Sequence, residues 1–315
     1  MQIIRGINNL KAIHSKSVVT IGNFDGIHLG HKKLFFYTRM IGKKYNITTV
    51  IILFEPQPLE FFKKKSAPIR ITTFREKIKN IIFYNIDKVL CIRFNKTFQS
   101  LCPKEFITKI LINKLNIKFL IIGDDFKFGC QRNGDINLLK KLGDQYSFHV
   151  VKVKSLYKNN IKISSTKIRE ALLNNDIKLA SQFLGRQFSV HGRVVHGNSI
   201  GKKIGYPTAN IILNKKFLLS NGVYAVKVNC FSNKKFLGIC NIGIKPSFFN
   251  IEKKRILEVY LFDTKIDLYG KYIEVILFKK IRDELYFSSI EKLQNQIFND
   301  IKKVKTYFNT FHNLE

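Results

Sequence analysis

The chain of 315 residues lacks several features that define other classes of protein. It has no tryptophan, and its apolar runs all stop well short of the roughly 20 residues that a membrane-spanning helix needs. The beginning of the chain also lacks the charged and apolar pattern of a secretory signal. We therefore expect a cytoplasmic protein with no membrane partner.

Cysteine is scarce and scattered. Five cysteines occur, and no two of them form a C-x-x-C pair. This spacing argues against a disulfide framework and against a structural zinc site, and it predicts reduced thiols. The cysteines are Cys91, Cys102, Cys130, Cys230 and Cys240.

Acidic residues are also few. The chain has 22 Asp and Glu against 55 Lys and Arg, which gives a net charge of +33. Such a charge favours nucleic acid, another polyanion or phosphorylated small molecules as ligands. The lysines are spread over both halves without forming one tract, which is typical of solvated faces. Since no RNA-recognition or helix-turn-helix pattern is present, we expect no specific nucleic-acid partner.

The first half alternates between β-type and helical patterns. Residues 17–21 are mostly β-branched, residues 32–45 have helical spacing, and residues 48–54 form a continuous apolar run. A continuous run suits a strand covered on both faces, and the order strand, helix, strand implies an α/β fold with a parallel sheet. Further strands are expected at 88–94, 119–122 and 148–153, and helices at 70–82, 103–115, from 164 onward, and up to Gly185.

Beyond Gly185 the pattern changes to short β-type runs separated by glycine or asparagine. Closely spaced runs of this kind predict an antiparallel β-barrel. A helix follows at the end of the chain, where Ser288 and Glu291 are expected to form a capping box. The boundary near residues 183–187 divides the chain into domains of residues 1–185 and 186–315. The β-type runs are 190–195, 223–228, 236–240, 256–262 and 272–277.

The most constrained stretch is residues 20–31, T-I-G-N-F-D-G-I-H-L-G-H, with two histidines and three glycines between a strand and a helix. At a helix start, His28 and His31 share one face, where free N–H groups and the helix dipole favour an anion. Plainer alternatives are histidines that satisfy turn hydrogen bonds, or half of a metal site with Asp25. Stabilisation of a phosphorus centre undergoing displacement explains more of the pattern.

Two other segments of the first half carry polar residues beside predicted elements. Residues 164–169, S-S-T-K-I-R, form a hydroxyl-rich helix start followed by a cation, a pattern that ordinary helix capping also produces. Residues 123–129, G-D-D-F-K-F-G, follow a strand. On their own they are a polar turn flanked by core aromatics.

In the second half, residues 201–210 read G-K-K-I-G-Y-P-T-A-N. This is not a P-loop, because no Ser or Thr follows Lys202 and the first glycine has the wrong spacing. Glycines and lysines at this spacing can wrap a polyphosphate, and Thr208 and Asn210 supply hard oxygen ligands suited to Mg²⁺. The stretch by itself is equally an ordinary loop and turn.

Together these stretches carry a family resemblance that covers nearly the whole chain. Residues 22–31 resemble the HxGH signature of the nucleotidyltransferase superfamily, in the form found in prokaryotic bifunctional riboflavin kinase/FAD synthetases, also called FMN adenylyltransferases. Residues 201–210 resemble the G-x-x-x-G-x-P-T-A-N motif of the riboflavin kinase domain. Weaker matches to other segments of this family are residues 53–58, 123–129, 164–169, 241–247, 257–261, 267–270 and 281–287.

The resemblance implies a Rossmann-like nucleotidyltransferase domain followed by a riboflavin kinase barrel. The barrel would phosphorylate riboflavin with ATP to give FMN, and the first domain would transfer AMP from a second ATP to FMN, giving FAD and pyrophosphate. Mg²⁺ would be the cofactor, the partners would be these small molecules, and the protein would be a monomer or weak oligomer. Two rival hypotheses are that only one activity survives, or that this is a basic RNA-binding protein on the same scaffold.

In the first domain the resemblance implies His28, His31 and Arg169 as catalytic residues. Gln57 stands where many relatives have histidine, which argues against an acid/base role there and leaves a hydrogen-bonding one. The implied ATP-binding residues are Gly22, Asn23, Phe24, Asp25, His28, His31, Ser164, Ser165, Thr166 and Arg169. The implied FMN-binding residues are Asp124, Asp125, Phe126 and Phe128.

In the second domain the resemblance implies Glu258 as the general base, which would accept the proton of the riboflavin 5′-hydroxyl. Without the resemblance, Glu258 would be an ordinary glutamate paired with a lysine, and Arg282 and Phe287 would only seat the final helix. The implied flavin-binding residues are Asn241, Arg282 and Phe287, and the implied Mg²⁺ ligands are Thr208 and Asn210. The implied ATP-binding residues are Gly201, Lys202, Lys203, Gly205, Pro207, Thr208 and Asn210.

Overall fold

The computed structural model describes residues 1–13, 15–197, 200–214, 216–230, 235–245, 254–264 and 266–312. The chain forms two compact units, Met1–Ser165 and Thr166–Glu315. The division by packing therefore falls after the first residue of helix α7 (Ser165–Leu173) and before α8 (Ile177–Leu184), whereas the sequence puts the domain boundary after both helices. A functional boundary at residues 185/186 remains a prediction.

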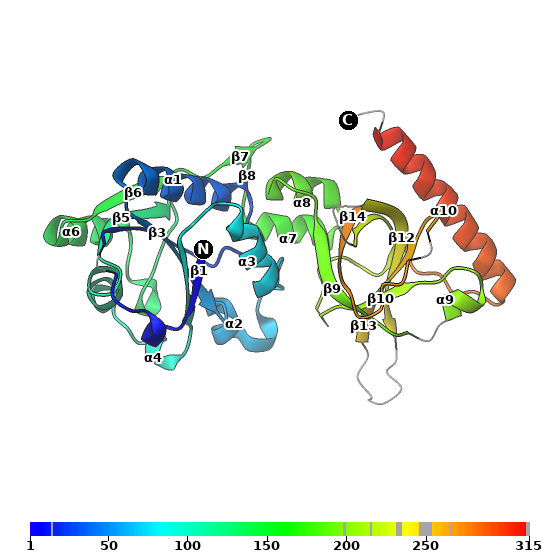
Figure 1. The fold of residues 1–315 in the computed structure, drawn as a ribbon, viewed down its shortest axis with the longest axis horizontal. Helices are drawn as coiled ribbons and strands as arrows, with labels where there is room; N and C mark the ends of the chain where they lie inside the picture. Colours follow the sequence, from blue (N-terminus) through cyan, green and yellow to red (C-terminus); the bar gives the residue numbers. More distant parts are fainter. Residues whose placement is uncertain are drawn as a thin grey trace. The chain divides into compact units, whose positions relative to one another are not determined.

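The first unit is built on a parallel six-stranded sheet with the order β1-β4-β3-β2-β5-β6 (Figure 1). This arrangement confirms the expected α/β fold. All of β2 is buried, as expected for a strand covered on both faces. The edge strand β1 was not predicted, because three of its four residues are exposed. The strands are β1 (Gln2–Arg5), β2 (Ser17–Ile21), β3 (Thr48–Glu55), β4 (Lys88–Arg93), β5 (Ile117–Gly123) and β6 (His149–Val153).

The helical and short elements of this unit are η1 (Ile7–Asn9), α1 (Leu29–Tyr45), α2 (Pro58–Lys63), η2 (Lys64–Ser66), α3 (Phe74–Ile82), α4 (Lys96–Gln99), α5 (Pro103–Glu105), η3 (Phe106–Ile112), η4 (Cys130–Arg132), α6 (Ile136–Tyr146), β7 (Tyr157–Lys158) and β8 (Ile161–Lys162). Helices α1 and α3 pack on one face of the sheet, against side chains that include Val18. The segment η3 and helix α6 pack on the other face, against side chains that include Val19. Since successive residues of a strand point to opposite faces, each strand contributes to both layers.

Three helix predictions were wrong in detail. The helix expected at 70–82 begins only at Phe74, because the side chain of Thr73 caps it. Helix α1 begins at Leu29 and not at residue 32, because His28 occupies the N-cap position. The segment expected as one helix at 103–115 is the short α5 followed by the π-helical η3. None of these changes alters the order of the elements.

The second unit contains the predicted antiparallel barrel, which is closed with the strand order β10-β13-β12-β11-β14-β9. Its interior is filled by fully or almost fully buried side chains such as Tyr224, Val226, Leu257 and Val259. The strands are β9 (Ser189–Val195), β10 (Ala209–Ile212), β11 (Gly222–Asn229), β12 (Lys235–Lys245), β13 (Lys254–Leu261) and β14 (Tyr272–Arg282).

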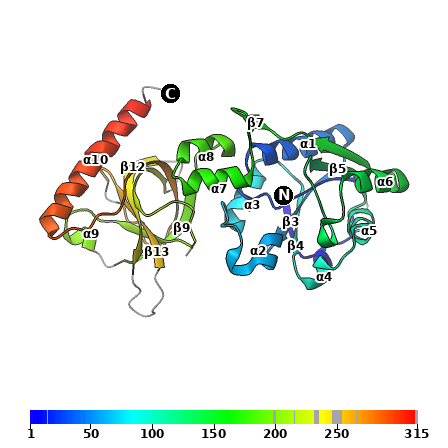
Figure 2. The ribbon, with the colours of Figure 1, turned by 180° about the vertical axis from the view of Figure 1, so that it is seen from behind.

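The predicted terminal helix is α10 (Ile290–His312), which packs along the outside of the barrel (Figure 2). Val304 and Phe308 of α10 are fully buried against barrel residues that include Val223 and Ile239. The expected capping box at Ser288 is wrong, because the hydroxyl of Ser289 accepts the backbone N–H of Lys292 and so caps the helix. The remaining helix of this unit is the short α9 (Ile200–Lys203).

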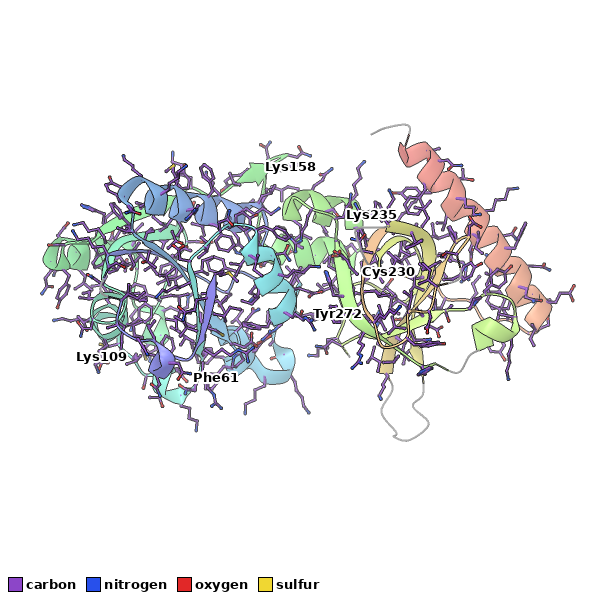
Figure 3. The ribbon with its side chains drawn as sticks, viewed as in Figure 1. Phe61, Lys109, Lys158, Cys230, Lys235 and Tyr272 are labelled. Carbon is purple, nitrogen blue, oxygen red and sulfur yellow. The ribbon has the colours of Figure 1, made fainter. Side chains whose placement is uncertain are left out.

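Exposed lysines occur in both units, and Figure 3 shows Lys109, Lys158 and Lys235 extending away from the backbone. This distribution matches the spread of lysines over both halves of the sequence. In the described part of the chain, no helix is both long and apolar enough to cross a membrane.

Candidate active sites

The first candidate site lies where β2 ends and α1 begins. Strand β3, which follows β2 in the sequence, pairs with one edge of β2. Strand β5, which comes later in the sequence, pairs with the other edge of β2. In parallel α/β sheets, ligands bind beyond the carboxyl ends of the strands at such a switch point. The turn that leaves β2 here spans residues 22–27 and carries four predicted ATP-binding residues, Gly22, Asn23, Phe24 and Asp25.

The backbone of this turn is strained. Phe24 (φ 48°), Gly26 (φ 81°) and Ile27 (φ 44°) all lie in the left-handed region, which costs a residue with a side chain about 1 kcal/mol or more. A Cβ on Gly22 would lie 2.9 Å from the Phe24 ring, so the ring packs directly on the glycine backbone. A strained turn of this kind persists only when its surroundings hold it.

His28 and His31 lie together, as predicted from their spacing. Their ring centroids are 3.5 Å apart and the ring planes differ by 23°. His28 is the N-cap of α1, and its Nδ1 accepts the backbone N–H of His31 at 3.4 Å. A bond accepted at Nδ1 leaves the neutral imidazole of His28 with its proton on Nε2. Gly30 permits this packing, because a Cβ there would lie 3.0 Å from Cε1 of His28.

His31 is held as a neutral imidazole. Burial, and then the nearby charges of His28 and Lys77, lower the pKa of His31 well below its ordinary value. The Phe24 ring packs edge-on against it, with the centroids 5.2 Å apart. Nδ1 of His31 is buried and has no hydrogen-bond partner among the described residues. Leaving such an atom unsatisfied costs about 1–3 kcal/mol, so a ligand that paired with it would recover that cost.

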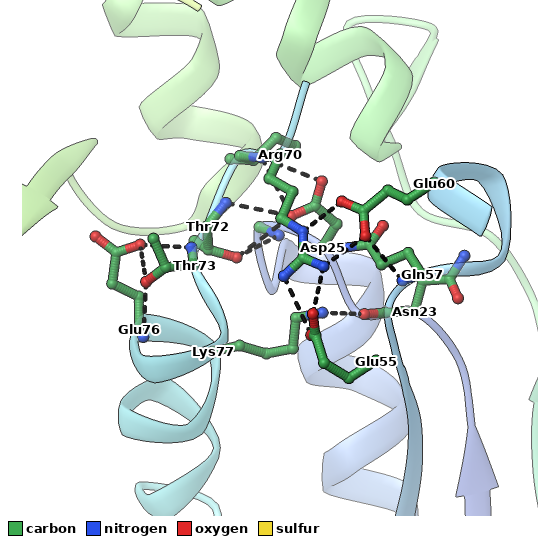
Figure 4. Close-up of polar contacts among 12 residues, drawn as sticks. Asn23, Asp25, Glu55, Gln57, Glu60, Arg70, Thr72, Thr73, Glu76 and Lys77 are labelled. Carbon is green, nitrogen blue, oxygen red and sulfur yellow. Dashed lines mark hydrogen bonds and ion pairs between the residues drawn. The ribbon is translucent and has the colours of Figure 1, made fainter. Parts of the chain in front are cut away.

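The turn is held from outside by two buried side-chain contacts, both visible in Figure 4. Asp25 is 2% exposed, and its carboxylate accepts the backbone N–H groups of Ile71 at 3.1 Å and Thr72 at 3.2 Å. Lys77 on α3 is fully buried, and its Nζ donates to the carbonyl oxygen of Asn23 at 2.6 Å. The carboxylate of Asp25 is therefore engaged within the protein, and its contact with ATP remains a prediction.

A charged cluster stands at the end of β3, the strand next to β2 (Figure 4). The guanidinium of Arg70 donates to the carboxylates of both Glu55 and Glu60. Burial acts to raise the pKa of Glu60, but the bonds from Arg70 and from the backbone N–H of Gln57 outweigh it, so the pKa of Glu60 is lowered. Gln57 is 7% exposed, and its Nε2 has no hydrogen-bond partner in the described part of the chain.

The predicted FMN-binding loop follows β5, the other neighbour of β2. Asp124 accepts the hydroxyl and the backbone N–H of Ser155, and the hydroxyl bond is the main cause of its lowered pKa. Asp125 pairs with a lysine of β8. Phe126 and Phe128 stack with centroids 5.7 Å apart, and both pack against the hydrophobic core. The loop is thus at the expected end of the sheet, and its contact with FMN remains a prediction.

The S-S-T-K-I-R segment begins helix α7, as expected. The hydroxyl of Ser165 donates to the carbonyl oxygen of Asp25 at 2.9 Å, which brings two predicted residues together. Thr166 and Arg169 lie further along α7, in the second unit. The roles of Ser164, Thr166 and Arg169 toward ATP remain predictions.

The second candidate site is a cavity of about 390 Å³ between the outer face of the barrel and α10. It collects residues that are far apart in the sequence. Predicted residues that line it are Gly201, Pro207, Thr208, Asn210, Asn241, Glu258, Arg282 and Phe287.

Strand register places the polar residues of this cavity in one row. Glu258 on β13 lies directly opposite Asn210 on β10 and opposite Asn241 on β12. Val223 and Arg282 continue the row across β11 and β14. Directly opposed residues of antiparallel strands share a face and lie about 4.5–5.5 Å apart. The neighbours of Glu258 along its strand are buried inside the barrel, so Glu258 faces outward, toward the cavity.

The G-x-x-x-G-x-P-T-A-N segment forms the entrance to β10. A Cβ on Gly201 would lie 2.4 Å from the carbonyl oxygen of Tyr206, so glycine is required for this close approach. Asn210 is 5% exposed, and its amide donates to the carbonyl oxygen of Thr208 at 3.4 Å. Lys203 and Gly205 belong to the same segment but do not line the cavity. The side chain of Lys202 and residues 246–247 of another matched motif lie outside the described part of the chain.

Arg282 is fixed in place by the terminal helix. Its Nε donates to Oδ2 of Asp300 on α10 at 2.8 Å, and Asp300 is 1% exposed. The guanidinium also lies over the Phe287 ring, 5.8 Å from its centroid. Glu284 is held by the amides of Asn221 and Asn241, at 2.9 and 3.4 Å. Arg282 therefore lines the cavity and also holds α10, whereas Phe287 lines the cavity. The contact of either residue with the flavin remains a prediction.

Sequence reasoning missed Lys77 and Arg70 in the first site and Glu284 and Asp300 in the second. A signal for Lys77 was present, because it lies on the apolar stripe of its helix with Phe74, Ile78 and Ile81. A lysine on a buried stripe is rare unless it has a partner. Asp300 carried the same signal, because it lies on the apolar stripe of α10 between Ile297 and Val304. Arg70 and Glu284 carried none.

Comparison with known proteins gives two matches to family models. Residues 10–167 match the FAD synthetase family, and residues 184–308 match the riboflavin kinase family. The bifunctional riboflavin kinase/FMN adenylyltransferase of Buchnera aphidicola subsp. Acyrthosiphon pisum is 64% identical over 99% of this chain and 100% of its own length. The protein of that description from Escherichia coli K12 is 43% identical, over 98% of both chains.

One solved structure is similar over nearly the whole chain. It is a crystal structure described as a macrolide-efflux protein from Streptococcus pneumoniae. The similarity has a TM-score of 0.83 at 30% sequence identity, and it covers 97% of this chain and 99% of the other.

Proposed function

Because the chain belongs to the family of bifunctional riboflavin kinase/FMN adenylyltransferases, we propose that its two sites divide the two reactions between them. The enzyme converts riboflavin and ATP into FMN, and FMN and a second ATP into FAD and pyrophosphate. The proposal assigns the first reaction to the cavity beside the barrel and the second to the histidine turn after β2.

For the kinase reaction, the proposal makes Glu258 the general base. The riboflavin 5′-hydroxyl gives its proton to Glu258 as its oxygen attacks the γ-phosphorus of ATP, and the bond to ADP breaks. The glycine-containing segment before β10 would cradle the polyphosphate, with Gly201, Lys202, Lys203, Gly205 and Pro207. Asn241, Arg282 and Phe287 would hold the flavin. The row in which Glu258 lies between Asn210 and Asn241 supports this assignment.

Mg²⁺ fits the donor set at Thr208 and Asn210. The Asn210 amide nitrogen is engaged with the Thr208 carbonyl, so the amide oxygen and the Thr208 hydroxyl are the hard oxygen donors of this strand entrance. Mg²⁺ commonly takes only one or two protein oxygens and completes its octahedron with phosphates and water. When bound, the ion would neutralise charge on the transferred phosphoryl group.

For the adenylyl transfer, an existing phosphate oxygen of FMN attacks the α-phosphorus of ATP, and the bond to pyrophosphate breaks. A phosphate oxygen needs no strong base, so positioning and electrostatics carry the catalysis. The Nε2–H of His28 and the neutral ring of His31 supply hydrogen bonds where charge develops. Ser165 and Arg169 are proposed to join them on the triphosphate, and the loop at 124–128 to hold FMN.

The observation that carries the proposal is the gathering of Asn210, Glu258, Asn241 and Arg282 in one row on the wall of one cavity. The test is to incubate the purified enzyme with riboflavin, ATP and Mg²⁺ and to separate the products by chromatography over time. We expect FMN to appear first and FAD to follow.

A parallel incubation with FMN in place of riboflavin tests the second reaction alone. FMN without FAD would leave only the kinase, and FAD from added FMN without phosphorylation of riboflavin would leave only the adenylyltransferase. Tight binding of generic RNA at physiological salt, together with neither product, would instead favour the RNA-binding alternative.

We further propose that the enzyme works as a monomer or weak oligomer in the cytoplasm, without a nucleic-acid partner. All five cysteines are free thiols, which fits a reducing compartment. Sedimentation of the purified protein across a range of concentrations tests the first of these points.

A further inference from the structure

Lys77 is the most unusual charged residue of the first unit. It lies on α3 with Ile78 and Ile81 and is 0% exposed. Burying an ammonium group is costly unless it is paired and hydrogen-bonded. Its Nζ donates to the Asn23 carbonyl at 2.6 Å, within the strained turn that precedes His28.

The surroundings of Lys77 contain both signs of charge. The carboxylates of Asp25, Glu55 and Glu60 favour its ammonium form, whereas the guanidinium of Arg70 opposes it. Burial is the largest influence, and the pKa of Lys77 is lowered from its ordinary value. Figure 4 shows Lys77 with the labelled members of this network, which come from β3, helix α2, the 22–27 turn and the segment before α3.

We propose that Lys77 is a positioning residue for adenylyl transfer: its buried ammonium clamps the Asn23 carbonyl and so fixes the turn that carries the two histidines. This inference rests on the proposed function of that turn. The hydrogen bond ties Asn23, the residue before Phe24, to helix α3. It therefore helps to hold the turn in the conformation that gives Phe24 and Ile27 their positive φ angles.

The same ammonium has a second effect. Burial is the main cause of the lowered pKa of His31, and the positive charge of Lys77 acts in the same direction. A neutral His31 presents both a donor and an acceptor nitrogen, whereas a protonated one presents two donors. Lys77 therefore fixes the place of the imidazole pair and contributes to the protonation state of His31.

Three variants separate these effects. Lys77→Met removes the donor and the charge, Lys77→Gln keeps a donor without the charge, and Lys77→Arg keeps both. Lys79→Met is the matched control, because Lys79 lies on the same helix but is exposed. Far-ultraviolet circular dichroism and thermal unfolding of each variant establish that it is folded. If Lys77→Met does not fold, Lys77→Gln carries the test.

The expected result is a fall of about tenfold to a hundredfold in kcat for FAD formation from FMN in Lys77→Met, the size of effect that a displacement of about 1 Å produces. The KM for FMN and the rate of FMN formation from riboflavin should stay within about twofold, since Lys77 touches neither substrate in this scheme. Lys77→Arg should recover most of the activity, and Lys79→Met should match the parent enzyme.

The pKa of His31 distinguishes this role from a merely structural one, because a loss of packing alone would leave it unchanged. Its imidazole resonances, assigned with His31→Gln, are followed by NMR against pH in the full-length parent and variants. We expect the pKa of His31 to rise in Lys77→Met and Lys77→Gln and to be unchanged in Lys77→Arg. The acid limb of the kcat profile for FAD formation should move upward with it.

An unchanged His31 titration in folded Lys77→Met, or an unchanged kcat, would overturn the inference. Failure of the proposed function itself looks different. In that case the parent enzyme makes no FAD at all, while the NMR titration still reports whether Lys77 acts on His31.

Discussion

The two candidate sites are built in opposite ways. The site after β2 takes its two histidines and its strained turn from twelve consecutive residues, 20–31. Only the side chains that hold this turn in place come from other segments of the chain. The barrel site takes its residues from five strands and the terminal helix, so residues 201 and 300 line the same cavity. The first site is specified by local backbone geometry and the second by strand register. A substitution in one should therefore leave the other intact.

The largest effects are expected from a matched pair of variants that tests whether the two sites act independently. Glu258→Gln should reduce FMN formation by about 10²–10⁴-fold, the contribution typical of a positioned general base. His31→Ala should reduce FAD formation from FMN by about 10²–10³-fold, as for loss of one electrostatic contact in a transition state. Each is measured as kcat/KM for both reactions.

In each variant the other reaction is the internal control and should be unchanged. If a folded Glu258→Gln enzyme lost FAD formation from added FMN as well, or if His31→Ala lost riboflavin phosphorylation, the two sites would be coupled and the comparison above would fail.

The next test concerns the ion pair that holds α10 to the barrel beside the cavity. Asp300→Asn should remove the charge that balances Arg282 and destabilise the second unit by about 3 kcal/mol, the lower end for a broken buried ion pair. Urea unfolding followed by hydrogen exchange of the barrel amides measures this in the full chain. The first unit should keep its protection.

Asp283→Asn is the matched control for that measurement. Asp283 pairs with Lys280 at 2.5 Å, but its side chain is 83% exposed. Exposed pairs of this kind contribute little, so the variant should resemble the parent enzyme. Equal losses from both variants would mean that Asp300 does not lock α10 to the barrel.

The smallest expected effect is a pH dependence of the stability of the first unit, which contains the histidine turn. In the folded chain the pKa of His31 lies well below its ordinary value, mainly because of burial. As the pH falls through about 6.5, the unfolded chain binds a proton at this position that the folded chain does not. The free energy of unfolding of the first unit should therefore decrease below that pH, and it should stop decreasing once the folded pKa is reached.

His31→Gln removes this titration, so its stability should decline less over the same range. Denaturant midpoints of the parent and the variant at pH 7.5, 6.5 and 5.5 give the comparison. A constant difference between the two across this range would show that His31 does not titrate as described.

The two sites also differ in how much of each could be predicted from the sequence. The HxGH stretch was found because its residues are adjacent, and the helix start at His28 put them on one face as expected. Glu258, Asn241 and Arg282 were found only through the family resemblance, because nothing in their own neighbourhoods marks them as one site. Lys77 was missed although it breaks an apolar stripe, since sequence alone does not reveal which carbonyl a buried ammonium will meet.

The sequence by itself determined the alternation of strands and helices, the change from a parallel sheet to an antiparallel barrel, and the location of the two stretches proposed to bind phosphate. These features depend on hydrophobic periodicity and on glycines at turns, which act over a few residues. The tertiary structure alone decided that Asn210, Glu258 and Asn241 stand in one row, that Asp300 meets Arg282, and that Lys77 holds Asn23. Such contacts depend on strand register and on packing between distant segments, where a shift of one residue in a strand would turn every side chain to the other face.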